Sequence, residues 1–187
     1  MRELPEPRYL FLDLETTGLD PHRDQVTECA WKDDAGRSFH RFVDHSVPPT
    51  QWVLDKTDYL TRIKSAAKKI PQTLFIAYLQ NTCDMLKAEH GGNAQVYLVG
   101  ANPTFDDSFI CELTAGYRPY NYHLICIETV VLGYLLGKGL PVPKKERVPR
   151  TLKTLRSLVG IEGENPEPHT AQADADEVKL IWDHINK

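Results

Sequence analysis

The sequence feature that most constrains the fold is the stretch Phe11–Leu19, which reads Phe-Leu-Asp-Leu-Glu-Thr-Thr-Gly-Leu. Successive side chains of a β-strand point to opposite faces, so the leucines lie on one face and Asp13 and Glu15 lie on the other. Asp is depleted in strands, and two like charges this close raise each other's pKa unless a cation lies between them. The stretch therefore predicts either a divalent-metal site near the end of a strand or an exposed acidic face on an edge strand.

The composition is that of an ordinary globular protein. The chain has 187 residues, of which 41% are hydrophobic and 26% are charged, so we expect a single domain with a substantial core. The formal net charge of -4 argues against tight non-specific binding to duplex DNA, which needs many cationic contacts to phosphate. A cluster of metal-binding carboxylates is compatible with this charge, because bound cations would neutralise it.

Cysteine spacing and hydropathy argue against three further classes of protein: zinc-binding, disulfide-rich and membrane-spanning. The four cysteines are scattered and form no Cys-x-x-Cys pair, which argues against a zinc site and against a disulfide scaffold. Residues 1–8 are polar and contain proline, and the apolar run Leu124–Leu136 carries Glu128 and is too short to cross a bilayer. We therefore expect no membrane partner and a reducing, cytoplasmic location.

Periodicity and turn residues predict the order of the elements. After the first strand, the predicted strands are Gln25–Trp31, Ser38–Val43, Gln95–Val99 and His123–Ile127. The predicted helical segments are Gln51–Lys69, about Pro71 to Gly91, Gly100–Ile110, Thr129–Lys138, Leu152–Val159 and about Thr170 to Asn186. The first three strands form an antiparallel meander. Strands followed by alternating helices and strands predict an α/β protein with a mixed sheet covered by helices.

A further candidate carboxylate directly follows the strand predicted at Gln95–Val99. Asp106 lies just past the carboxyl end of that strand, where sites in α/β proteins form. Phe105 and Phe109 are one helical turn apart and can pack together, which fixes the direction of Asp106. Asp107 is rotated by about 100° and should face elsewhere. The alternative is that Asp106 only interacts favourably with the helix dipole.

The last predicted helix adds another carboxylate and a histidine. Asp174 shares the apolar face of this helix with Ala171 and Val178, where a carboxylate is costly unless it is paired or metal-bound. Asp176 points roughly the opposite way and should be solvated. His169 precedes Asp174 by five residues, so it can reach the same site only from the loop before the helix. The alternative is a surface histidine without a chemical role.

Together these residues resemble the DEDDh family of 3′–5′ exonucleases, which includes the proofreading subunit of bacterial DNA polymerase III, ribonuclease T and oligoribonuclease. The motif Asp-x-Glu-Thr-Thr-Gly-Leu is matched at Asp13–Leu19, and Asn-x-x-Phe-Asp-x-x-Phe is matched at Asn102–Phe109. The final motif, His followed five positions later by Asp, is matched by His169 and Asp174. One departure is Ala101, where many relatives have His, and it concerns local packing rather than a ligand.

The resemblance implies a ribonuclease-H-like fold, a five-stranded mixed sheet flanked by helices, in a single exonuclease domain over residues 1–187. It implies that two Mg²⁺ or Mn²⁺ ions, about 3.5–4 Å apart, are held by four carboxylates. These are Asp13, Glu15, Asp106 and Asp174. Hard divalent ions suit such oxygen ligands better than zinc does. His169 would be the general base for the attacking water, and nucleoside 5′-monophosphates would be released.

The resemblance also implies which residues contact the substrate. Thr16, Thr17 and Leu19 would contact the terminal nucleotide of a single-stranded 3′ end, with Asn102 and Phe105 as further candidates. Sequence-neutral stacking of this kind suits a single strand.

A predicted loop carries several basic residues: Lys144, Lys145, Arg147 and Arg150. These side chains would guide the phosphate backbone towards the site, or the loop is simply solvated.

Three functions remain open from the sequence. The first is a 3′–5′ exonuclease that trims or proofreads DNA, with a DNA polymerase as a candidate partner, although we expect no C-terminal extension of the kind that binds one. The second is an exoribonuclease acting on RNA ends or short oligoribonucleotides, because the motif residues do not reveal how the site treats a 2′-hydroxyl. The third is a nucleic-acid-binding module without catalysis, which the intact set of reactive residues disfavours.

Overall fold

The computed structural model describes residues 5–142, 151–163 and 169–187. Its strands are β1 (Pro7–Thr16), β2 (Val26–Asp33), β3 (Ser38–Phe42), β4 (Gln95–Gly100) and β5 (Ile125–Cys126). Its helices are α1 (Gln51–Lys56), α2 (Gln72–Glu89), α3 (Pro103–Leu113), α4 (Ile127–Gly137), α5 (Leu152–Leu158) and α6 (Ala171–Ile185), together with the π-helical turn η1 (Tyr59–Ile63). Within the described ranges, none of the helices has the length and apolarity that crossing a membrane requires.

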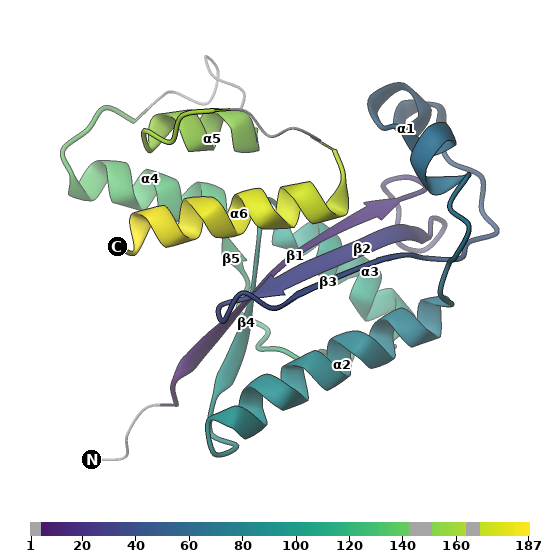
Figure 1. Ribbon diagram of the computed structural model, residues 1–187, viewed down its shortest axis with the longest axis horizontal. Helices are drawn as coiled ribbons and strands as arrows, with labels where there is room; N and C mark the ends of the chain where they lie inside the picture. The colour runs from purple at the N-terminus through teal and green to yellow at the C-terminus, as the bar shows by residue number, and fades with distance from the viewer. Residues whose placement is uncertain (1–4, 143–150, 164–168) are drawn as a thin grey trace.

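Within these residues the strands form one five-stranded mixed sheet in the order β3-β2-β1-β4-β5. β1 pairs antiparallel with β2 and parallel with β4, and β2 pairs antiparallel with β3, so the predicted meander and the predicted mixed sheet are confirmed. Helices α4, α5 and α6 lie on one face of the sheet, and α2 and α3 lie on the other (Figure 1). β1 is central, so the alternative of an acidic face on an edge strand is wrong.

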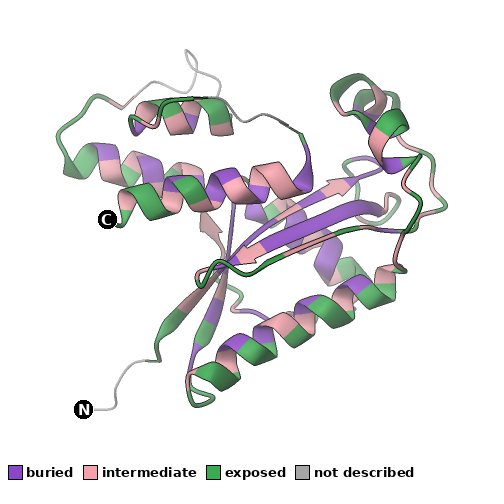
Figure 2. Ribbon diagram, viewed as in Figure 1, coloured by how far each residue is buried: buried purple, intermediate pink, exposed green. Residues whose placement is uncertain are grey.

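The two faces of β1 belong to two cores, as its alternation predicts. Leu10, Leu12 and Leu14 pack into the core beneath α2 and α3, whereas Phe11 packs into the core beneath α4, α5 and α6. β2 is accordingly buried along most of its length, and β1 is exposed only at its start (Figure 2). The register of β1 with β4 ends at the pair Phe11–Val99, so the rest of β1 extends past the carboxyl end of its parallel neighbour.

The stretch Gln51–Lys69, predicted to be helical throughout, contains two short helical pieces. Thr50 caps α1, and the helix ends at Thr57, which has extended backbone angles and donates its hydroxyl to the carbonyl of Val53. After η1 the chain returns to the sheet, where Ile70 forms a parallel bridge with Val43. The requirement to reach this bridge, rather than local propensity, ends the helical segment.

The strand predicted at His123–Ile127 is much shorter. The side chain of Asn121 bonds to the backbone N–H of His123 and to the side chain of Gln95, which holds residues 121–123 in a turn outside the sheet. Ile127 already belongs to α4 and is fully buried in the core beneath α4, α5 and α6. The predicted loops Pro141–Pro149 and Glu162–Pro168 lie largely outside the described residues.

Candidate active site

A tight turn ends β1 and fixes the position of its last residues. The carboxylate of Asp24 accepts hydrogen bonds from the Thr17 hydroxyl at 3.2 Å and from the backbone N–H of Asp20 at 2.9 Å. A Cβ atom at Gly18 would lie 2.4 Å from an oxygen of Asp24, so a side chain at this position would displace the Asp24 carboxylate from these hydrogen bonds. The hydroxyl of Thr16 donates to the carbonyl of Gly18 at 2.5 Å. The turn therefore holds the end of β1 rigidly.

Three carboxylates meet beyond the end of the β1–β4 pairing. Asp13, Glu15 and Asp174 each offer an oxygen, and these atoms all lie within 4.8 Å of one another. Asp174 comes from the first turn of α6, which approaches the sheet closely through a cluster of three buried alanines: Ala30, Ala171 and Ala175. Asp176, predicted to be solvated, is instead partly exposed and ion-paired with Lys32 at 2.7 Å.

Asp106 completes the set from the first turn of α3. Its Oδ1 accepts a hydrogen bond of 2.9 Å from the backbone N–H of Leu14, which ties the start of α3 to β1. The rings of Phe105 and Phe109 pack with their centroids 5.1 Å apart, as their spacing predicts. Asp106 is outside the group of three oxygens above, yet its charge raises the pKa of Asp13 more than any other neighbouring charge does.

The electrostatics of these four carboxylates favour the protonated forms. Burial is the largest cause in every case, and it raises the pKa of Asp13 well above its usual range. Burial and then the charge of Glu28 raise the pKa of Glu15 to about 8. Burial raises the pKa of Asp106 to about 8 and the pKa of Asp174 to about 7. A hard divalent cation would remove this repulsion, and an all-oxygen donor set suits Mg²⁺ or Mn²⁺.

His169 lies on the loop directly before α6, where the sequence places it. The residue is exposed and has a φ of 65°. Thr170 follows it as the cap of α6 and accepts a hydrogen bond from the N–H of Ala173 at 3.1 Å. The carbonyl of His169 accepts a hydrogen bond from Arg62 at 3.3 Å, and a backbone hydrogen bond from His169 lowers the pKa of Asp174. The backbone of His169 is thus linked to the carboxylate cluster.

A pocket of about 250 Å³ opens beside Glu15. Four of the five predicted substrate contacts line it: Thr16, Leu19, Asn102 and Phe105. Thr17 is not among the lining residues, because it is fully buried and its hydroxyl is used within the turn. Trp52 of α1 also lines the pocket and is 53% exposed, and its sequence context gave no sign of this position.

A buried ion pair beside the cluster was also missed from the sequence. Glu28 lies opposite Glu15 in the register of β1 and β2 and has no exposed surface. Its carboxylate accepts hydrogen bonds from Arg62 at 2.9 and 2.8 Å, and the ring nitrogen Nε2 of His40 lies 2.8 Å away. The sequence signal that could have revealed this ion pair is Glu28 itself, an acidic residue among the mostly apolar residues Val26–Ala30.

Comparisons with known proteins establish the fold. No protein-family model matches the chain, and no curated protein matches it. The zinc-bound E. coli exonuclease I–single-stranded DNA complex is similar, with a TM-score of 0.70 and 19% identity over 97% of this chain and 40% of that chain. E. coli exonuclease I in complex with a dT13 oligonucleotide has a TM-score of 0.68 and 20% identity over 97% of this chain and 41% of that chain.

A thermophilic relative of these proteins is similar as well. Exonuclease I from Methylocaldum szegediense has a TM-score of 0.66 and 19% identity over 96% of this chain and 40% of that chain. The chain therefore spans about 40% of the length of these proteins. The five-stranded mixed sheet with flanking helices is the ribonuclease-H-like fold that exonuclease I also has, and the predicted fold class is confirmed.

Proposed function

We propose that residues 1–187 form a single exonuclease domain that removes nucleotides from the 3′ end of single-stranded DNA and releases nucleoside 5′-monophosphates. The observation that carries the proposal is the meeting of Asp13, Glu15 and Asp174 within 4.8 Å, with Asp106 beside them. Such a largely buried group of like charges weakens the fold unless a cation binds, so a role in metal binding accounts for it.

The four carboxylates would hold two divalent ions, Mg²⁺ or Mn²⁺. Their chemistry supports this assignment, because all the donors are hard oxygen atoms and their pKa values are raised by burial and mutual repulsion. When bound, the ions would lower the pKa of a water molecule and stabilise the charge that develops on the scissile phosphate. His169, on the loop before α6, would accept the proton of the attacking water.

The pocket beside Glu15 would hold the terminal nucleotide. Leu19 and Trp52 expose 61% and 53% of their surfaces and line this pocket together with Phe105. Apolar and aromatic side chains bind a base by stacking, which is worth about 1–3 kcal/mol per base and does not depend on its identity. Similar proteins were solved with dA13 and dT13 oligonucleotides, which supports single-stranded DNA as the substrate. A DNA polymerase partner lacks such support, and the proposal does not include one.

Timed digestion of 5′-end-labelled oligonucleotides tests the proposal. Single-stranded DNA, duplex DNA and RNA of one sequence are incubated with Mg²⁺, with Mn²⁺ and with EDTA. We expect single-stranded DNA to shorten stepwise from its 3′ end, to yield 5′-monophosphates, and to stay intact in EDTA. Faster digestion of RNA would favour the exoribonuclease alternative. Internal cleavage, or no cleavage with either metal ion, would refute the proposed function.

A further inference from the structure

The guanidinium group of Arg62 connects two parts of the candidate site that are distant in sequence. From η1, its Nη2 donates to both carboxylate oxygens of Glu28 on β2, at 2.9 and 2.8 Å. Its Nη1 donates to the backbone carbonyl of His169 at 3.3 Å. One planar group therefore bridges the central sheet and the loop that precedes α6.

The side of this bridge that faces the sheet is rigid. Glu28 has no exposed surface and also contacts His40 of β3 at 2.8 Å, so its carboxylate is held from two neighbouring elements. Charge-assisted hydrogen bonds of this kind are short and strong. The turn that carries Arg62 is itself anchored, because Tyr59 and Ile63 of η1 are buried with Val53 in a small apolar cluster.

The other side of the bridge contacts the backbone of His169, which has an unfavourable conformation. His169 has a φ of 65°, in the left-handed region that residues other than glycine seldom adopt. Such conformations persist when the surrounding structure holds them, and they are concentrated at functional sites. The backbone of His169 is bonded to Asp174 on one side and to Arg62 on the other.

We propose that Arg62 is a positioning residue: anchored on Glu28, it holds the backbone of His169 so that the loop keeps this residue beside the carboxylate cluster. The inference rests on the proposed function only in giving His169 a catalytic role. The bridge suits arginine, because Nη2 bonds the carboxylate while the separate nitrogen Nη1 reaches the carbonyl, whereas all three donors of a lysine leave from one nitrogen.

Hydrogen exchange measured by mass spectrometry tests the bridge without any need for activity. In Arg62→Ala and in Arg62→Lys, we expect amides of peptides covering residues 170–174 to exchange roughly tenfold faster than in the parent. Arg41→Ala is the matched control, because Arg41 lies on the neighbouring strand β3 and donates to the carbonyl of His40 instead. Unchanged exchange in both Arg62 variants would overturn the proposal, whatever the enzyme does.

A double variant separates loss of the bridge from misfolding of the whole domain. Arg62→Ala alone leaves the charge of Glu28 buried and uncompensated, which can destabilise the whole domain. The double variant Arg62→Ala with Glu28→Gln removes that charge together with the bridge. It should fold and show the same local increase in exchange over residues 170–174. A folded double variant with parental exchange would contradict the proposed role of Arg62.

A double-mutant cycle tests whether Arg62 acts through His169. With single-stranded DNA and Mg²⁺, Arg62→Ala should lower kcat by about 10²-fold, the cost of a small misplacement, and leave KM nearly unchanged. In the His169→Ala background the same change should have little further effect. Equal losses in both backgrounds, a rise in KM alone, or full activity of Arg62→Lys would show that Arg62 acts by charge or by binding substrate. A parent without nuclease activity, but with the expected exchange, would refute the proposed function and leave the bridge intact.

Discussion

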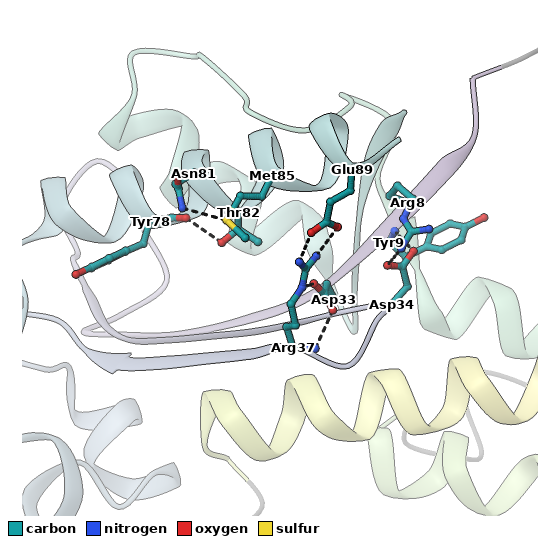
Figure 3. A network of polar contacts seen from close by, with 10 residues as sticks. All are labelled: Arg8, Tyr9, Asp33, Asp34, Arg37, Tyr78, Asn81, Thr82, Met85 and Glu89. Carbon is teal, nitrogen blue, oxygen red and sulfur yellow. Dashed lines mark hydrogen bonds and ion pairs between the residues drawn. The ribbon is translucent and has the colours of Figure 1, made fainter. Parts of the chain in front are cut away.

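The two ends of the β1–β2 pair carry similar acidic residues in opposite electrostatic states. At the amino end of β1, Asp33 is ion-paired with Arg37, which also binds Glu89 of α2, and Arg8 binds Asp34 at 2.7 Å (Figure 3). At the carboxyl end, Asp13 and its neighbours repel one another and their pKa values are raised. The fold pairs the acidic residues at the first end, whereas at the second end Arg62 pairs with Glu28 and the remaining carboxylates keep negative charge in excess.

The adjacent residues Asp106 and Asp107 show the same contrast between a paired and an unmatched carboxylate. Asp107 accepts hydrogen bonds from Arg118 at 2.7 Å and from the hydroxyl of Tyr120 at 2.9 Å. Burial raises the pKa of Asp107, but these hydrogen bonds outweigh it and hold the pKa below its usual value. The pKa of Asp106 is raised to about 8. A carboxylate matched by arginine supports the fold, whereas a carboxylate left in excess is available to bind a cation.

The largest expected effect is that of Asp13→Asn. This change removes a proposed metal ligand, so cleavage should fall by at least about 10³-fold, in the upper range for loss of one electrostatic group in an active site. The metal-free variant should be as stable as the parent or more stable, because one repelling charge is gone. Digestion assays and urea unfolding in EDTA measure the two effects. Cleavage within about tenfold of the parent would exclude the metal-binding role.

His169→Ala should have the next largest effect. Loss of a positioned general base costs roughly 10²–10⁴-fold in rate. Metal binding, measured by calorimetry, should stay close to that of the parent, because His169 is assigned no role as a ligand. If metal affinity collapses instead, His169 binds the metal and the proposed assignment is wrong.

The excess charge should also make the stability of the metal-free protein depend on pH. The folded-state pKa values of Glu15, about 8, and of Asp174, about 7, lie above the usual values near 4. Between about pH 4 and pH 8 the folded protein therefore binds more protons than the unfolded chain, and the free energy of unfolding falls as the pH rises. The slope is up to about 1.4 kcal/mol per pH unit for each such proton.

Urea unfolding in EDTA at several pH values between 5 and 8 measures this dependence. Added Mg²⁺ should restore stability most strongly at the upper end of the range, where the carboxylates are most ionised. An Asp13→Asn control should show a shallower slope. Stability that increases across the range would mean that the carboxylates already have their counter-ions within the fold.

The adjacent aspartates allow a direct test of the contrast. Asp107→Asn leaves Arg118 without its charged partner and with one acceptor oxygen in place of two, and weakening this partly buried, charge-assisted pair should cost about 1–3 kcal/mol of stability, with activity retained. Asp106→Asn should cost no stability without metal, because the amide oxygen can still accept from Leu14, but it should abolish cleavage. Unfolding and digestion of both variants measure these effects. If both variants lost stability, or both lost cleavage, Asp106 and Asp107 would not differ in role as proposed.

The sequence predicts those elements that carry a complete local pattern. The alternation in β1 gave both of its faces, and the apolar face shared by Ala171 and Val178 marked α6. The stretch Gln51–Lys69 and the strand at His123–Ile127 were mispredicted for a different reason. The end of the first depends on the bridge between Ile70 and Val43, and the length of the second depends on hydrogen bonds of Asn121. Such contacts between distant segments leave no local pattern.

The residues of the candidate site likewise divide into those with a local sequence pattern and those that depend on contacts between distant segments. The motif residues are recognisable because each motif is continuous in the sequence, and the structure brings their carboxylates together, while their chemical roles stay predictions. The contact between Glu28, His40 and Arg62 joins three elements, and its members meet only once the register of β2 and β3 and the position of η1 are known. Trp52 similarly reaches the pocket only because α1 packs beside the turn after β1.

The smallest expected effect is that of Glu89→Gln, at the end of the sheet where charges are matched. Arg37 binds Glu89 at the surface, and after the change it keeps its bonds to the buried carboxylate of Asp33, including the backbone hydrogen bond of 2.8 Å. Water and salt screen an exposed pair, so activity and the melting temperature should both stay close to those of the parent. Melts at low and high salt measure this, with Glu28→Gln as the matched control at a buried pair. Equal losses from the two changes would mean that burial does not make the pair of Glu28 with Arg62 more important for stability than the surface pair of Glu89 with Arg37.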